Sequence, residues 1–299
     1  MRKIEGYIVP IITPFTEDNK VDYEGYARNM EYLISEGIDG ICVQGSFGEG
    51  MILNAEERQE IYKLAVKVAA GRCTVIGGAS ACTTADAIQN ARWAKEAGCD
   101  GILVVQPPYI QPSFDEMFDF FKDINDAVDI PILVYNNPSK SAAKNLTPAF
   151  CARLKTLKNV VAYKEASPNF YDLEENIRLN ADEDFNIICG KEFWALPAML
   201  LGAKGCFGLI PLILGNEAIK MVEYAKAGEW DKAAKVQLRV NIVRKAMNSI
   251  TCTPPAGVKA MMNMLGRDGG HNRRPIQDPT PEDMAIMRKA LIECGALKE

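Results

Sequence analysis

Lys164 is the residue whose type and position point most directly to chemistry in this sequence. It ends the apolar run 160–163, a pattern that is typical of a buried strand. An ammonium group in a low-dielectric setting loses its proton more easily, and a neutral amine attacks a ketone to form a Schiff base. The position therefore predicts covalent carbonyl chemistry. The alternative is a lysine at a strand end whose charged head simply reaches water.

Two tyrosines and a glycine-rich loop follow other predicted strands. Tyr109 and Tyr135 come at strand ends, as Lys164 does. Glycines in the segment 45–50 let backbone N–H groups turn toward a carboxylate, helped by the Ser46 hydroxyl. Together these residues predict a site with an amine and a proton relay. The alternatives are a tight turn that needs its glycines only for their dihedral angles, and tyrosines that are ordinary amphipathic barrel residues.

The chain has a single histidine, His271, in the polar segment 269–274. Zinc sites with two or three histidines cannot be assembled from it, and a Ser-His-Asp or Cys-His couple would have to recruit this one residue. The motifs that surround such nucleophiles are also missing. We therefore expect no metal site of this kind, and proton transfers that use Tyr, Lys, Ser or carboxylate groups.

Composition excludes several classes of protein. The 299 residues are 48% hydrophobic and carry a net charge of −5 with both signs interspersed, which argues against nucleic-acid or anionic-membrane binding. No apolar run approaches the roughly 20 residues of a membrane span, and the first residues lack the apolar core of a signal peptide. The nine cysteines contain no Cys-x-x-Cys pair, so we expect reduced, buried thiols in a soluble, cytoplasmic protein.

Short apolar runs recur at intervals of roughly thirty residues, and each is followed by a helical pattern. The runs are 7–12, 40–44, 74–78, 101–106, 132–136, 160–164, 185–190 and 205–209. Several of the helices have recognisable first residues: Asn54 with Glu57, Ser113 with Glu116, and Thr147 before Pro148.

Eight strand-helix units of this length predict a closed parallel barrel, whose outside is covered by helices. The alternative is an open, doubly wound sheet, which the missing Gly-x-Gly-x-x-Gly loop after the first strand disfavours. From about Gly228 onward the pattern is helical, over 230–249, 256–265 and 281–294. The sequence thus predicts a (β/α)8 TIM barrel over 1–224 and a C-terminal helical domain over 225–299.

The order of motifs resembles the pyruvate-dependent class I aldolases, a family that includes dihydrodipicolinate synthase and N-acetylneuraminate lyase. The similarity covers essentially the whole chain, and several motifs in order are more specific than any one alone. They are Pro-Ile-Ile-Thr-Pro-Phe at 10–15, Gly-Ser-Phe-Gly-Glu at 45–49, Tyr135-Asn136-x-Pro138, Tyr-Lys-Glu-Ala at 163–166, Gly190, and Pro-Pro-Ala-Gly-Val-Lys at 254–259.

The resemblance implies a role for each matched residue. Lys164 forms an imine with pyruvate or another 2-oxo acid, Tyr135 shuttles protons, and Ser46 with its loop amides holds the carboxylate. Tyr109 reaches the site of a neighbouring subunit, which implies a homo-oligomer, expected to be a tetramer. The second reactant is an aldehyde, and the covalent lysine needs no cofactor. The expected substrate-binding residues are Phe47, Gly48, Lys140, Gly190 and Phe207.

Departures from the family pattern affect the second substrate. Phe47 follows Ser46 where the family usually has a second hydroxyl residue, which predicts a narrower or more apolar pocket. Lys140 stands where the synthases carry an arginine, so a bidentate fork becomes a point charge, unless Lys140 is a plain surface lysine. The segment does not match the lyases' Pro-Ala-Leu-Ser/Thr-Gly stretch either. Cys82 and Pro108 replace the residues typical of the synthases' lysine-feedback site, so we do not expect feedback by lysine.

These departures favour a lyase acting on a 2-oxo sugar acid or hydroxy-2-oxo acid. A 4-hydroxy-tetrahydrodipicolinate (dihydrodipicolinate) synthase of lysine biosynthesis is the first alternative. An imine-dependent dehydratase or deaminase is the second. From another class, a non-catalytic barrel could bind a small acid, but intact Lys164 and Tyr135 argue against it.

Overall fold

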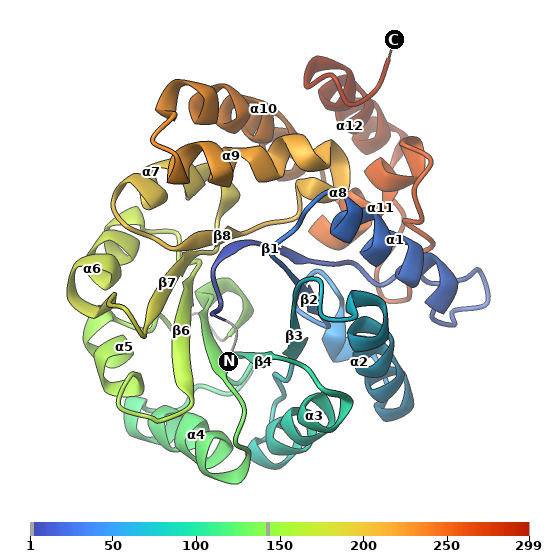
Figure 1. The fold of residues 1–299 in the computed structure, drawn as a ribbon. Coiled ribbons are helices and arrows are strands. Elements are labelled where there is room, and N and C mark those ends of the chain that lie inside the picture. The colour runs from blue at the N-terminus through green and yellow to red at the C-terminus, as the bar shows by residue number, and fades with distance from the viewer. Residues whose placement is uncertain (1–2, 142–143, 299) are drawn as a thin grey trace.

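Eight parallel strands close into a barrel in chain order, and β8 pairs with β1 to complete the ring. The computed structural model describes residues 3–141 and 144–298. All eight predicted runs form strands (Figure 1), and the predicted TIM barrel is confirmed. The strands are β1 (Gly6–Pro10), β2 (Gly40–Val43), β3 (Thr74–Gly78), β4 (Gly101–Val105), β5 (Ile132–Asn136), β6 (Val160–Glu165), β7 (Asn186–Cys189) and β8 (Gly205–Phe207).

Helices surround the barrel and then continue beyond it (Figure 1). Those that follow successive strands are α1 (Tyr23–Ser35), α2 (Ala55–Ala69), α3 (Thr84–Ala97), α4 (Phe114–Ala127), α5 (Pro148–Leu154), α6 (Phe170–Asn180), α7 (Ala195–Leu200) and α8 (Pro211–Leu214). Three short 3-10 helices precede others: η1 (Gly50–Ile52), η2 (Pro138–Lys140) and η3 (Glu192–Trp194). Within the described residues, no helix has the length and apolarity needed to cross a membrane.

The C-terminal part of the chain is helical, as predicted. It contains α9 (Asn216–Lys226), α10 (Trp230–Ser249), α11 (Pro254–Met264) and α12 (Pro281–Glu293). In Figure 1, α10 lies beside α9, and α11 contacts α8 and α12. The division of the chain at 224/225 stays a prediction, and α9 runs across that position.

The predicted helix starts are present as side-chain caps. Asn54 and Ser113 each form a capping box with the glutamate three residues later, and Thr147 accepts from the N–H of Phe150. Each cap satisfies N–H groups that the first helical turn leaves without partners, typically worth about 1 kcal/mol. The caps thereby set where the helices begin after the loops at the barrel mouth.

Side chains alternate between the inside of the barrel and the layer under the helices. On β6, Ala162 belongs to the inner apolar cluster, whereas Tyr163 packs in the outer core between strands and helices. Lys164 is two residues beyond Ala162 and so faces inward, where the cluster includes Tyr135 and Phe207. The strand period thus places this cation in an apolar interior.

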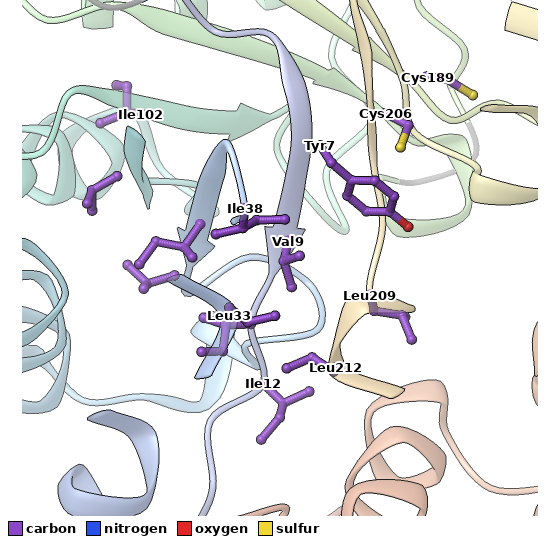
Figure 2. Packing of buried hydrophobic residues seen from close by; sticks show 14 of the residues in the cluster. Tyr7, Val9, Ile12, Leu33, Ile38, Ile102, Cys189, Cys206, Leu209 and Leu212 are labelled. Carbon is purple, nitrogen blue, oxygen red and sulfur yellow. The ribbon is translucent and has the colours of Figure 1, made fainter. Parts of the chain in front are cut away.

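The outer core holds the helices against the barrel. Figure 2 shows Tyr7, Val9 and Ile12 with Leu33, Leu209 and other buried side chains that meet between β1 and its neighbours. Burying each large apolar side chain is worth about 1.5–3 kcal/mol. All nine cysteines are free thiols, and seven are buried, whereas Cys82 is exposed and Cys252 partly exposed. This agrees with the expectation of reduced, buried thiols.

Candidate active site

Lys164 lies between two aromatic rings inside the barrel. The pairing of β5 with β6 sets Tyr135 opposite Lys164, and Nζ lies 3.8 Å from the ring centroids of both Tyr135 and Phe207. The residue is only 5% exposed. Burial lowers the pKa of Lys164 to about 7, although the negative charges of nearby groups such as Glu192 act in the opposite direction. A large fraction of this amine is therefore neutral and nucleophilic near neutral pH.

Tyr135 presents a hydroxyl beside that amine. Asn137 Nδ2 donates a hydrogen bond of 2.6 Å to its Oη. Burial raises the pKa of Tyr135, and hydrogen bonds with Asn137 and Ser46 partly offset the rise. The hydroxyl thus keeps its proton at neutral pH, and Tyr135 connects Lys164 with Ser46.

The loop after β2 adopts a conformation that requires its glycines. A Cβ atom on Gly48 would lie 2.8 Å from the backbone nitrogen of Gln44, and one on Gly50 would lie 2.2 Å from the carbonyl oxygen of Gln44. Gln44 and Glu49 both have left-handed backbones, with φ of 59° and 52°. Such conformations are strained for residues other than glycine, so contacts elsewhere must hold the loop in place.

The same loop presents N–H groups without protein partners. The Gly48 carbonyl accepts from the Thr13 hydroxyl at 2.7 Å. In the described part of the chain, the N–H groups of Ser46, Phe47 and Gly48 donate to no protein acceptor. A series of free N–H groups in one turn suits a bound carboxylate. The role of this loop in binding a carboxylate stays a prediction.

A cavity of about 270 Å³ lies next to this loop and Tyr135. Three of the predicted site residues, Ser46, Tyr135 and Lys140, line it. Apolar side chains make up much of its remaining wall, and α11 closes one side. These further residues include Met51, Ile52, Leu103, Val105, Pro108, Thr253, Pro254 and Pro255. The cavity has space for a small acid beside the exposed Lys140, whereas the buried Lys164 is not part of its lining.

The structure places the other predicted residues differently. Phe207 lies against Lys164 instead of lining the cavity. Phe47 and Gly48 are also outside the lining, because Phe47 packs against the outer core. The apolar walls that were expected from Phe47 come instead from other residues. The N–H of Gly190 donates to the Glu165 carbonyl at 2.7 Å, and a Cβ there would lie 2.7 Å from that of Ala166, so close strand packing explains this glycine.

Tyr109 lies away from these groups within the single chain. It is 93% exposed and has a left-handed backbone with φ of 71°, which is unusual for an aromatic residue. Its strained backbone turns a large ring into solvent. The role of Tyr109 in a neighbouring subunit's site stays a prediction.

Sequence reasoning missed the contacts that hold the carboxylate-binding loop. Glu49 forms an ion pair with Lys259 of α11, and both side chains are almost completely buried. Lys259 Nζ also donates to the His271 carbonyl at 3.2 Å. Arg58 donates to the Gly50 carbonyl from α2. The matched segment 254–259 was a signal for this role, but only the tertiary structure pairs Lys259 with Glu49.

Sequence reasoning also missed a cluster of hydrogen bonds to the Glu165 carboxylate, next to the candidate reacting residues of β5 and β6. Asn136 Nδ2 donates to both carboxylate oxygens of Glu165, at 2.9 and 3.0 Å. Asn176 and the Ser167 N–H also donate to this carboxylate. Burial raises the pKa of Glu165 to about 7, and the hydrogen bonds oppose that rise. Because Asn136 and Glu165 are the chain neighbours of Tyr135 and Lys164, this contact joins β5 and β6 at the level of the candidate reacting groups.

The single histidine, His271, contacts the segment around Phe15 through its backbone. His271 is exposed, and its N–H donates to the Phe15 carbonyl at 2.8 Å. Within residues 3–141 and 144–298, no three His, Cys, Asp or Glu side chains gather in a way that could hold a metal ion.

We expect Tyr135→Phe to lower kcat about 10²- to 10³-fold while the protein still forms a covalent adduct with the keto acid at Lys164. The change removes only the hydroxyl, so proton transfer is lost and the aromatic wall beside Nζ is kept. Steady-state kinetics together with intact mass after reduction separates the two effects. A Tyr135→Phe protein with unchanged kcat would exclude the proton-transfer role, and Tyr171→Phe, on the exposed face of α6, is the matched control.

The chain resembles known proteins over its whole length. The model of the dihydrodipicolinate synthetase family matches residues 3–293. A 4-hydroxy-tetrahydrodipicolinate synthase of Methanosphaera stadtmanae is 34% identical over 295 residues, covering 97% of this chain and 98% of the relative. The corresponding protein of Methanocaldococcus jannaschii is 32% identical over 294 residues, covering 98% and 99%.

Solved structures of dihydrodipicolinate synthases have the same fold as this chain. The crystal structure of dihydrodipicolinate synthase from Aquifex aeolicus is 33% identical, with a TM-score of 0.93 over 99% of this chain and 100% of that one. The enzyme from Thermotoga maritima has a TM-score of 0.93 at 26% identity, covering 99% and 100%.

An eight-stranded barrel with a buried lysine at the end of its sixth strand, together with these matches, defines a lyase of the class I aldolase type. Such enzymes condense pyruvate with an aldehyde. The chain belongs to the dihydrodipicolinate synthetase family.

Proposed function

We propose that this protein condenses pyruvate with an aldehyde through an imine on Lys164, as a 4-hydroxy-tetrahydrodipicolinate synthase. The observation that carries the proposal is the position of Nζ, buried between the rings of Tyr135 and Phe207 with a pKa of about 7. A neutral amine at the mouth of a barrel, beside a tyrosine hydroxyl and a carboxylate-binding loop, is suited to imine chemistry.

The residues divide the reaction between them. The free N–H groups of the loop and the Ser46 hydroxyl bind the carboxylate of pyruvate. The Lys164 amine attacks the keto carbon, and Tyr135 donates a proton to the hydroxyl that leaves as water. The Tyr135 phenolate left by that step takes a proton from the neighbouring methyl group, which gives an enamine. Tyr135 returns this proton to the aldehyde oxygen as the enamine carbon attacks the aldehyde carbon. Hydrolysis of the product imine returns Lys164 as a free amine.

The choice of second substrate follows the relatives. The departures at Phe47 and Lys140 favoured a sugar-acid or hydroxy-2-oxo-acid lyase, but the relatives in the comparison are 4-hydroxy-tetrahydrodipicolinate synthases over their full length. The comparisons therefore support the first alternative better than the main prediction. Aspartate semialdehyde is accordingly the first aldehyde to test.

Lys140 is the feature that keeps the sugar-acid or hydroxy-2-oxo-acid lyase as a second candidate. It lines the cavity with an exposed side chain, so its ammonium is available to a substrate. An ammonium group binds a carboxylate as a point charge, without the planar double hydrogen bond of arginine. We therefore propose Lys140 as a substrate contact in either reaction.

We also propose a cytoplasmic homo-oligomer, with a tetramer expected. The exposed, strained Tyr109 supports an intersubunit contact, because a neighbouring chain would cover its ring. Fully active monomers in sedimentation experiments would contradict the role of Tyr109 in a partner's site.

Reduction with borohydride in the presence of pyruvate tests the first half-reaction. We expect a single covalent adduct on the peptide that contains Lys164, detected by intact mass and peptide mapping. Because only the neutral amine attacks, the initial rate of adduct formation should rise with pH through about 7 and level off above it. A rate that is independent of pH, or an adduct on another lysine, would contradict the assignment.

A comparison of aldehydes tests the second half-reaction. The wild-type protein with pyruvate should be assayed with aspartate semialdehyde, N-acetylmannosamine and small sugar-derived aldehydes. Turnover of the first, and its loss in Lys140→Ala, supports the synthase. Efficient turnover of a sugar-derived aldehyde alone supports the second candidate.

A further inference from the structure

Two basic side chains approach one aromatic ring at the barrel mouth. Lys191 comes directly after Gly190, beyond the carboxyl end of β7, and Arg244 reaches the same place from α10. Lys191 Nζ lies 5.7 Å and Arg244 Cζ 5.9 Å from the centroid of Phe193. Lys191 Nζ also lies 5.2 Å from the ring of Trp194. Aromatic faces attract cations, so the Phe193 ring keeps both groups in the same region beyond β7.

Among the residues that the structure describes, neither cation has a carboxylate at hydrogen-bond distance, although Arg244 has a long ion pair with Glu192. The nearest approach is 3.8 Å, between an Arg244 guanidinium nitrogen and Glu192 Oε2. The other oxygen of Glu192 accepts from the Tyr7 hydroxyl at 2.6 Å and from the Ile210 N–H at 2.8 Å. The barrel therefore holds one oxygen of Glu192, and the other forms a long ion pair with Arg244. Figure 2 shows Tyr7 beside Cys206 in this part of the barrel.

The donors of both cations are consequently available. Arg244 Nε is buried and has no hydrogen-bond partner. Within the described residues, its one side-chain hydrogen bond, of 3.8 Å, goes to the weakly accepting sulfur of Met247. Lys191 Nζ donates to no group within residues 3–141 and 144–298. Unused donors on partly buried cations cost free energy that a bound anion would recover.

Burial and like charge both act on the two cations. The Arg244 side chain is only 17% exposed, and Lys191 is partly buried. Burial lowers the pKa of Lys191, and the like charge of Arg244 lowers it further. A guanidinium fork and an ammonium on one side of the mouth match a carboxylate or phosphate.

The pair is close enough to influence the reacting groups. The charge of Arg244 contributes to lowering the pKa of Tyr135, although burial dominates and raises it. Lys140 and Ser46 line the cavity from the loops after β5 and β2, whereas Lys191 and Arg244 come from β7 and α10. Neither Lys191 nor Arg244 lines that cavity, so an anion that they bind would lie outside its lining, on the side of η3 and α10.

We propose that Lys191 and Arg244 form a second anion subsite, which binds a carboxylate or phosphate at the far end of the aldehyde substrate. The inference rests on the proposed condensation of pyruvate with an aldehyde, and it deepens that proposal by assigning a charge to the second substrate.

Matched aldehydes test the subsite. With pyruvate in excess, kcat/KM is compared for glyceraldehyde 3-phosphate against glyceraldehyde, and for succinate semialdehyde against butanal. The first pair reports on phosphate and the second on carboxylate. We expect the wild-type protein to prefer at least one anionic member, and Arg244→Gln to reduce that preference about 10- to 100-fold. Lys191→Gln should act in the same direction, and Lys245→Gln, an exposed lysine on α10, should not.

Two further measurements separate the possible failures. Every variant is first treated with pyruvate and borohydride. An adduct in the variants shows that the fold and the first half-reaction are intact, whereas no adduct in the wild-type protein contradicts the proposed function itself. Calorimetric titration of the pyruvate-bound protein with succinate and with inorganic phosphate is the readout if no aldehyde reacts. Equal anion affinity and equal aldehyde preference in wild type, Arg244→Gln and Lys191→Gln would overturn the subsite.

Discussion

Replacing Lys164 by alanine is expected to abolish the adduct with pyruvate and to lower kcat by at least about 10³-fold. In the structure, the aromatic rings of Tyr135 and Phe207 both contact the Lys164 amine. Intact mass after borohydride reduction and steady-state kinetics measure the two effects. Lys164→Arg keeps a positive charge and should be equally inactive, because a guanidinium does not form the imine.

A stability measurement shows that such losses do not come from unfolding. The pKa of Lys164 falls from 10.5 to about 7 on folding because burial disfavours the charged form. Lys164→Met should therefore raise the free energy of unfolding, on the order of a few kcal/mol. This increase in the free energy of unfolding is largest below pH 7, where Lys164 is charged in both states. It shrinks as the pH rises from about 7 toward 10.5, where Lys164 of the unfolded chain also loses its proton. Urea unfolding at several pH values measures it, and a destabilised Lys164→Met protein would contradict the buried position. Lys204→Ala, an exposed lysine beside β8, is the control for adduct formation.

Replacing Lys259 by methionine is expected to lower the free energy of unfolding by about 3–5 kcal/mol. Lys259 is 1% exposed, and the change leaves the Glu49 carboxylate buried without its counter-ion. Burial already raises the pKa of Glu49 and lowers that of Lys259, so neither group tolerates isolation as an ion. Urea unfolding measures the loss. Because Glu49 belongs to the carboxylate-binding loop, the KM for pyruvate should rise more than kcat falls.

The double variant Glu49→Gln/Lys259→Met distinguishes the ion pair from simple packing. It removes both charges, so most of the lost stability should return. Lys235→Met, an exposed lysine on α10, should change stability by less than about 0.5 kcal/mol. A Lys259→Met protein as stable as the wild type, with an unchanged KM, would show that the pair does not hold the loop.

The architecture could be predicted from the sequence because it depends on local patterns. Apolar runs of strand length alternate with helical segments, and this order along the chain predicts a barrel without knowledge of individual strand contacts. Capping residues such as Asn54 and Ser113 specify where helices begin. The position of Lys164 at a strand end was visible for the same reason, since inward and outward positions alternate with a period of two.

The contacts around the site could not be predicted in this way. Glu49 and Lys259 are more than two hundred positions apart, and no local pattern states that one neutralises the other. Phe47 appeared to be a pocket wall, yet it turns into the outer core and leaves that role to other side chains. Lys191 and Arg244 meet only because η3 and α10 pack together.

The sequence by itself determined the barrel, the buried lysine and the tyrosine beside it, because strand periodicity and chain order specify which residues face inward. Only the tertiary structure decided the proton affinity of Lys164, the ion pair between Glu49 and Lys259, and the positions of Lys191 and Arg244 beside the Phe193 ring. Desolvation and charge pairing depend on distances between residues far apart in the chain, and these distances exist only once the helices have packed around the barrel.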